Sequence, residues 1–263
     1  MVMQQRVDAG RRKPLLKLDW GIDGVRFALK EGSIVVIVDT LRFSTAVTTA
    51  VAHGFTIYPV ADRKSGEALA RSLGAEMSGR PGEAKYTISP LTYLNPQAGS
   101  LPEIVLYSPN GAACATLARD SDTVYIGCFL NARAVAGILS SKAVEQGRDV
   151  TVVAAGEQRA IETGERIVYD KEAAYPVFAI EDYLASGAII SHTELGRSAE
   201  ADLCAMAFHA AQDRIDDLLD RSFSGRYLIE NGLEEDIIHA VRHDIYDVVP
   251  IVRHERIVRV QES

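Results

Sequence analysis

Residues 34–54 read IVVIVDTLRFSTAVTTAVAHG and decide the expected fold. The first five are all apolar and β-branched, which is typical of a strand buried on both faces. An alanine-rich stretch follows and stops at Gly54, as helices often do. A buried strand that leads directly into a helix is the repeating unit of a parallel α/β sheet.

The turn between this strand and helix carries polar side chains suited to a site. Ligands of open α/β sheets bind beyond the carboxyl ends of the strands, which is where Asp39 falls. Arg42 offers a planar fork for phosphate oxygens and, with the helix N-terminus, favours the ionised form of Asp39. Ser44 or Thr45 can cap the helix, whose first N–H groups attract anions. The segment indicates either a site for a divalent cation and an oxyanion or a capping loop with a surface ion pair.

The alternation of strand and helix continues along the chain. Strands are expected over 55–60, 104–107, 123–126 and 150–154, and helices over 64–73, 112–119, 131–146 and 171–186. Glycines stand where these helices would end, at Gly54, Gly74, Gly147 and Gly187. This pattern predicts an α/β fold of three layers, α/β/α, with a mainly parallel sheet.

Three regions are expected. Residues 1–14 form a loose N-terminal tail, 15–190 the α/β sheet region with a polar site at the strand ends, and 191–263 a helical region that returns to the sheet. A long, proline-rich loop covers 79–103, and such loops are uncommon unless functional. A helix over 198–221 and strands over 248–252 and 256–260 complete the chain. The helix carries an apolar stripe that serves either the core or a homodimer contact: Leu203, Met206, Ala207, Ala210, Leu218 and Leu219.

Net charge, cysteine spacing and the length of apolar runs limit the classes of function that are expected. The 263 residues carry a net charge of −8, which disfavours nucleic acid as the main partner. The three cysteines, Cys114, Cys128 and Cys204, lack C-x-x-C spacing, so a reducing cytoplasm is expected rather than a disulfide or zinc framework. No secretory signal is expected, and no apolar run approaches the ~20 residues needed to cross a bilayer.

Other polar residues follow the predicted strands. Asn110 and Asn131 can each cap a helix or contact an anion, and Gly111 lets a backbone N–H approach one closely. Glu181 and Asp182 are adjacent, and Mg²⁺ prefers one or two carboxylates with waters. Glu83, in the long loop, is a further carboxylate candidate, although solvated acids are the commoner reading.

Several standard signatures are absent from the sequence. Leu41 stands where an aspartate-nucleophile phosphatase needs its second acid, and no Walker A or G-x-G-x-x-G motif occurs. Cys128 can be a nucleophile at a strand end, although a buried, inert cysteine is the more common case. His239 and His243 are one helical turn apart but lack the acid of an H-E-x-x-H motif, so they are expected at the surface.

Taken in order, these segments resemble the 2-phosphosulfolactate phosphatase family, the magnesium-dependent enzymes of coenzyme M biosynthesis. The resemblance extends from about residue 33 to the C-terminus. Its matching runs are 38–45, 82–83, 109–111, 127–132, 155–156, 180–182 with 186–188, 225–228 through 232–236, and 247–250. The family usually has an arginine after the loop glutamate, where this chain has Ala84.

The resemblance implies a Mg²⁺-dependent phosphatase that acts on a small anionic phosphorylated substrate. Asp39 is then the first choice for metal ligand or catalytic acid or base, with Glu181, Asp182 and Glu83 as further acids. Arg42 holds the phosphate, and the substrate contacts are Ser44, Thr45, Asn110, Gly111 and Asn131. Two alternatives stay open: a non-catalytic binding protein for a small anionic metabolite, and a different metal-dependent hydrolase with Cys128 as nucleophile.

Overall fold

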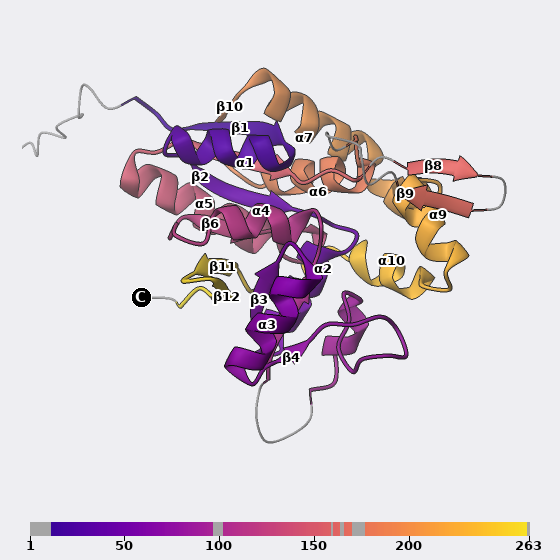
Figure 1. The fold of residues 1–263 in the computed structure, drawn as a ribbon. Helices are drawn as coiled ribbons and strands as arrows, with labels where there is room; N and C mark the ends of the chain where they lie inside the picture. Colours follow the sequence, from indigo (N-terminus) through magenta and orange to yellow (C-terminus); the bar gives the residue numbers. More distant parts are fainter. Residues whose placement is uncertain (1–11, 97–101, 159, 164–165, 170–176, 262–263) are drawn as a thin grey trace, which may run out of the picture.

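Strand β2 (Ile34–Val38) lies inside a ten-stranded sheet that has helices on both faces (Figure 1). Ile34, Val36 and Val38 belong to one apolar cluster, whereas Val35 and Ile37 belong to another. Because successive side chains of a strand point to opposite faces, both faces of β2 are buried. The expected three-layer α/β/α arrangement, with a mainly parallel sheet, is confirmed.

The computed structural model describes residues 12–96, 102–158, 160–163, 166–169 and 177–261. The sheet order is β10–β1–β7–β2–β6–β11–β12–β3–β5–β4. Its other strands are β1 (Leu15–Trp20), β3 (Thr56–Val60), β4 (Glu76–Met77), β5 (Glu103–Tyr107), β6 (Val124–Ile126), β7 (Val150–Ala154), β10 (Gly196–Arg197), β11 (Pro250–Arg253) and β12 (Arg256–Arg259). A separate two-stranded sheet pairs β8 (Ala160–Thr163) with β9 (Arg166–Tyr169).

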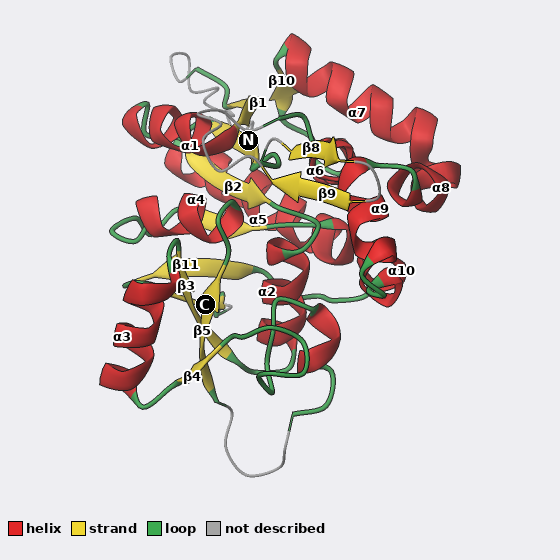
Figure 2. Ribbon diagram, turned by 45° about the vertical axis from the view of Figure 1, so that its right-hand side comes forward, coloured by secondary structure: helices red, strands yellow, loops and turns green. Residues whose placement is uncertain are grey.

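The sheet consists of two parallel blocks joined by an antiparallel hairpin. The first block runs from β10 to β6, and the second contains β3, β5 and β4. The hairpin β11–β12 lies between them and pairs antiparallel with β6 on one side and β3 on the other. Figure 2 shows β3 and β5 running steeply across the direction of β1 and β2, so the two blocks do not form one flat sheet.

Helices cover the sheet on both sides. One apolar cluster joins it to α5, α6 and α7, and the other joins it to α1, α2 and α4. The helices are α1 (Gly21–Lys30), α2 (Phe43–Ala52), α3 (Arg63–Leu73), α4 (Gly111–Leu117), α5 (Ala132–Gln146), α6 (Ile180–Ser191), α7 (Ala199–Ala211), α8 (Ile215–Asp220), α9 (Phe223–Glu230) and α10 (Glu234–Ala240).

The expected helix over 171–186 is wrong in its position. Residues 171–176 lie outside the described residues, and α6 begins at Ile180 and continues past Gly187 to Ser191. Gly187 does not end the helix. A Cβ placed on it would lie 2.5 Å from the carbonyl oxygen of Cys204, so glycine is needed there for the close approach of α7.

The expected continuous helix over 198–221 is also wrong. It is broken into α7, a 3-10 turn (Gln212–Arg214) and α8. The face of α7 that packs inward carries Cys204 and Phe208, whereas Leu203 and Met206 of the expected stripe are each 60% exposed.

The region 191–263 shares the sheet of the preceding region, since β10, β11 and β12 lie in it. Of the expected N-terminal tail, residues 1–11 lie outside the described part of the chain, and Arg12 forms an ion pair with Asp149. Within the described residues, no helix is long and apolar enough to cross a membrane.

Candidate active site

A cleft of about 580 Å³ lies where the ends of strands from both blocks meet. Asp39 and Arg42 follow β2, Asn110 follows β5, and Glu157 follows β7. The covering wall comes from α9 and the segment before α10, through Ser224, Tyr227, Leu228, Asn231 and Leu233. The predicted convergence of strand ends on Asp39 is therefore confirmed for the tips of β5 and β7.

Asp39 is held rigidly at the buried end of this cleft. Its side chain is 5% exposed. Its Oδ1 accepts the N–H of Phe43 at 3.2 Å, and its Oδ2 accepts the N–H of Gly111 at 2.7 Å. The first of these bonds satisfies an N–H at the start of α2, so Asp39 does the capping that was expected of Ser44 or Thr45.

Gly111 is required for this geometry by its lack of a side chain. A Cβ at this position would lie 2.4 Å from Cδ1 of Phe43 and 2.6 Å from Oδ2 of Asp39. Both distances are shorter than any ordinary contact, because carbon atoms pack at about 3.5–4.0 Å. Gly111 thus contacts Asp39 through its backbone N–H and does not itself line the cleft, so the expected contact with substrate stays a prediction.

Asp182 is the second buried acid near the end of β2. Its Oδ1 accepts the N–H of Thr40 at 2.7 Å, and its Oδ2 accepts the N–H of Gly156 at 3.0 Å. Glu181 precedes it at the start of α6, and both side chains are only 2% exposed. Burial raises the pKa of both carboxyls, and the negative charge of Asp39 raises both further.

The ionisation of Asp39 differs from expectation. Burial raises the pKa of Asp39 to about 6, although the N–H groups of Gly111 and Phe43 and the charge of Arg42 all lower it. The cost of removing a carboxylate from water therefore exceeds the effect of these neighbours. Burial therefore favours the protonated forms of Asp39, Glu181 and Asp182.

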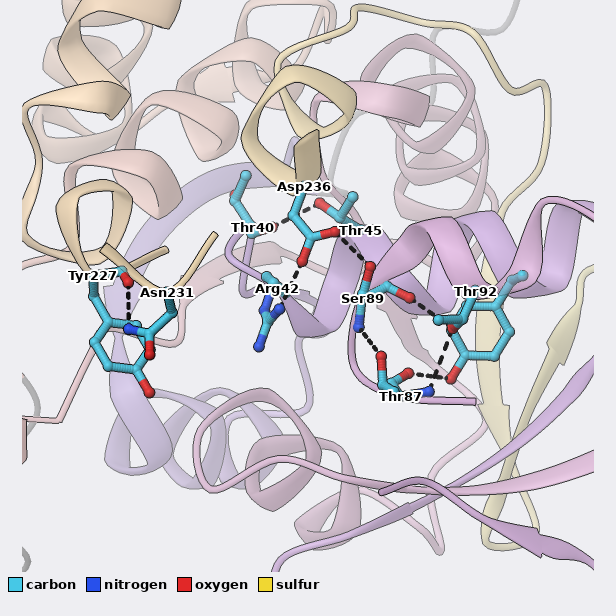
Figure 3. A network of polar contacts seen from close by, with 10 residues as sticks. Thr40, Arg42, Thr45, Thr87, Ser89, Thr92, Tyr227, Asn231 and Asp236 are labelled. Carbon is cyan, nitrogen blue, oxygen red and sulfur yellow. Dashed lines mark hydrogen bonds and ion pairs between the residues drawn. The ribbon is translucent and has the colours of Figure 1, made fainter. Parts of the chain in front are cut away.

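Arg42 is oriented by an acid from the C-terminal helices. Its Nη1 lies 2.6 Å from Oδ2 of Asp236 on α10, and Asp236 is 1% exposed (Figure 3). The other carboxylate oxygen accepts the hydroxyl of Ser89 at 2.5 Å. Ser89 belongs to the loop that was expected to be functional. Asp236 was missed because three consecutive acids, 234–236, stand at the start of α10, and their order gives no indication of which one points inward.

Glu157 was not selected either, although it follows a predicted strand. Its Oε1 accepts Nδ2 of Asn110 at 2.8 Å and the N–H of Gln158 at 2.7 Å. Burial, with the nearby charges of Asp39 and Glu181, raises the pKa of Glu157 to about 8. Asn110 therefore lines the cleft beside an acid whose raised pKa favours its protonated form.

The remaining candidates lie in different surroundings. Ser44 and Thr45 are fully buried and bond to backbone groups of Ile37, Asp39 and Thr40. Asn131 is also buried and bonds to Cys128, Ile126 and Val248. None of these three lines the cleft. Their contacts support structural roles around the site.

Cys128 is fully buried, whereas Glu83 is exposed to solvent. Cys128 has no exposed surface, its Sγ lies 3.6 Å from Oγ1 of Thr48, and burial raises the pKa of its thiol to about 11. Such a thiol is a poor nucleophile.

Glu83 is exposed at the edge of the cleft. His239, expected at the surface, is only 3% exposed and lies 3.0 Å from Oγ1 of Thr49, whereas His243 is exposed as predicted.

The comparison with known proteins decides the family. The model of a family described as 2-phosphosulpholactate phosphatase matches residues 24–255. The chain belongs to this family. It is 30% identical over 229 residues to a probable 2-phosphosulfolactate phosphatase of Carboxydothermus hydrogenoformans, with 84% of this chain and 86% of that protein covered. It is also 30% identical over 244 residues to a 2-phosphosulfolactate phosphatase of Methanothermobacter thermautotrophicus, with 90% and 94% covered.

The matched range of the 2-phosphosulpholactate phosphatase family includes the three acids that line the cleft, Asp39, Glu83 and Glu157. Buried Glu181 and Asp182 also fall within it, as does the Arg42–Asp236 pair. The resemblance noted from short sequence runs is therefore confirmed.

The raised pKa values predict how the stability of this family member depends on pH. The carboxyls of Asp39 and Glu157 bind protons more tightly in the folded chain than in the unfolded chain, where acid pKa values are about 4. Their contribution to stability is therefore present below about pH 4 and is lost as the pH rises through 6 and then 8. We expect the melting temperature in EDTA to fall between about pH 5 and pH 9. Glu157→Gln should reduce the fall in melting temperature at the upper end of this pH range. A melting temperature of the parent that does not change with pH would contradict the prediction.

Proposed function

We propose that the chain is a Mg²⁺-dependent phosphatase that hydrolyses a small phosphorylated acid, 2-phosphosulfolactate or a related phosphomonoester. The observation that carries this proposal is the meeting of Arg42 with buried Asp39 and half-buried Glu157 in one cleft. Names of the relatives support it, since the two proteins described above are called 2-phosphosulfolactate phosphatases.

The acids fit a hard divalent cation. Asp39, Glu181 and Asp182 offer oxygen donors, which hard cations prefer. Burial raises the pKa of all three carboxyls, and a cation held beside them would favour their ionised forms. Among the residues that the structure describes, no group of three or more His, Cys, Asp or Glu is arranged to hold a metal ion alone. That suits Mg²⁺, which keeps several waters and uses one or two carboxylates together with substrate phosphate.

Asp39 is the buried acid that lines the cleft, so we infer that it contacts the ion directly. Glu181 and Asp182 are further candidates from the buried surroundings, and exposed Glu83 is the remoter one. When bound, the ion polarises a phosphoryl oxygen and neutralises developing charge. Arg42, held in place by Asp236, binds the other phosphate oxygens through the nitrogens that Asp236 does not occupy. Glu157 has its Oε1 bonded to two N–H donors, so its Oε2 is the atom that holds a proton for the departing alkoxide.

The test is turnover of phosphomonoesters with and without metal. We expect hydrolysis to stop when EDTA is in excess and to return when Mg²⁺ is restored. Unchanged turnover in EDTA contradicts the metal assignment. Binding of phosphorylated acids without turnover favours the alternative of a metabolite-binding protein. Loss of turnover on thiol alkylation, with the fold intact, favours the alternative with Cys128 as nucleophile.

We also propose where the enzyme is located, how it associates and what it binds. A cytoplasmic location is supported by three free, buried cysteines. A homodimer contact is placed on α7, where Leu203 and Met206 are exposed. The partner is a small anionic molecule rather than a nucleic acid, consistent with the net charge of −8.

A further inference from the structure

Two arginines outside the catalytic group line the same cleft. Arg63 is the first residue of α3, directly after the β3 turn, and Arg80 lies in the loop after β4. Both side chains are exposed, whereas Asp39 lies buried at the inner end. The inner end of the cleft is therefore acidic, and its outer part carries these two arginines and one exposed acid, Glu83.

Arg63 is oriented by an aromatic ring. Its Cζ lies 5.0 Å from the centre of the Tyr107 ring, so the guanidinium packs on the ring face. Tyr107 itself is positioned by its N–H, which donates to Oγ of the buried Ser78 at 3.1 Å. A guanidinium stacked in this way keeps its N–H donors for a ligand.

Arg80 is carried by a hydrogen-bonded turn. Its carbonyl oxygen accepts the N–H groups of Glu83 and Ala84 at 3.0 and 3.3 Å. The N–H of Gly79 bonds to the carbonyl of Tyr86 at 3.0 Å, which closes the base of the loop. The backbone of Arg80 is therefore fixed although its side chain is exposed.

Neither guanidinium is neutralised by the protein. Across the described residues, no carboxylate lies within 4.0 Å of Arg63 or Arg80 in an ion pair, whereas Arg42 is paired with Asp236. In a chain of net charge −8, two uncompensated arginines in one cleft attract a negative ligand to it.

We propose that Arg63 and Arg80 form a second anion subsite, which binds a carboxylate or sulfonate carried by the phosphorylated substrate. This inference rests on the proposed phosphatase function and specifies which phosphomonoesters the cleft selects. The phosphate lies at the inner end near Asp39 and Arg42. The second anionic group then lies toward the outer part, where planar guanidinium donors match its oxygens.

The experiment compares ethyl phosphate, which carries no second anion, with phosphoglycolate and 2-phosphoethanesulfonate, which carry a carboxylate and a sulfonate. The parent should have a higher kcat/KM for the two that carry a second anion. Arg63→Gln and Arg80→Gln should each lower the ratio of their kcat/KM to that of ethyl phosphate by about tenfold, which is the effect of losing a hydrogen bond to a charged group.

Arg71→Gln is the matched control, because Arg71 is an exposed arginine on the last turn of α3 and does not line the cleft. It should leave the ratio unchanged. If Arg63→Gln and Arg80→Gln also leave the ratio unchanged, the subsite is refuted.

Calorimetric titration with phosphoglycolate separates this inference from the proposed function. If the parent hydrolyses none of the three esters but binds phosphoglycolate in a manner that depends on both arginines, the phosphatase proposal fails and the subsite stands. If the parent hydrolyses ethyl phosphate as well as the other two, and the arginine variants bind phosphoglycolate as tightly as the parent, the phosphatase stands and the subsite fails.

Discussion

Asp39→Asn is expected to abolish turnover while the protein stays folded. Asparagine keeps the shape of the side chain, but its amide group leaves either the Phe43 or the Gly111 N–H without an acceptor, at a cost of about 1 kcal/mol. Removal of a buried charge acts in the opposite direction. The melting temperature should therefore stay near that of the parent, whereas kcat falls by about 10²–10⁴-fold, the usual contribution of a catalytic acid or base.

Thermal unfolding, Mg²⁺ titration and turnover of the same variant test this expectation. Asp149→Asn is the control, since Asp149 pairs with Arg12 and Lys17 outside the cleft. That change should lower stability and leave turnover intact, which is the opposite pattern. A folded Asp39→Asn protein with full turnover would exclude Asp39 from the chemistry.

The second large effect is expected for Gly111→Ala. The added methyl meets Phe43 at 2.4 Å and Oδ2 of Asp39 at 2.6 Å, so the ring and the carboxylate must both move. Overpacking of this kind costs about 1–3 kcal/mol of stability. Displacement of a catalytic group by about 1 Å costs on the order of 100-fold in rate. The variant should therefore lose stability and activity together, as seen in a melting curve and an assay on one preparation.

Gly137→Ala serves as the comparison, because no atom lies within 4 Å of the corresponding Cβ position on the exposed side of α5. Alanine in a helix interior is favoured over glycine by about 0.8–1.0 kcal/mol. This variant should be as stable as the parent or slightly more so. If Gly111→Ala behaves like Gly137→Ala, the tight packing around Asp39 is not needed for function.

The sequence predicts the first block of the sheet well because its signals are local. Five β-branched residues before Asp39 identify a buried strand. The alternation of strands and helices along the chain predicts that the strands pair in parallel. The same reasoning fails for Gly187, because helix-ending glycines and helix-contact glycines have the same local surroundings. Only the position of α7 against α6 distinguishes them, and that contact joins Gly187 to Cys204, which comes much later in the chain.

The candidate site is predictable where a residue follows a strand and obscure where it does not. Asp39, Asn110 and Glu157 all follow strands, and Arg63 follows the end of β3 by the same rule. Asp236 comes from a helix almost 200 residues after its partner Arg42, so nothing in the local sequence connects them. Cys128 and Asn131 also follow a strand, but their side chains point into the core. A position just after a strand does not determine the direction in which the side chain points.

The position of the β11–β12 hairpin has a consequence for biosynthesis. These strands are translated after every other strand of the sheet, yet they occupy its middle. Until residue 259 has been synthesised, the edges of β6 and β3 that face the hairpin have no strand to pair with. Unpaired edges are the surfaces through which nascent chains associate wrongly. Completion of the sheet, and with it the joining of its two blocks, must therefore wait until β12 has left the ribosome.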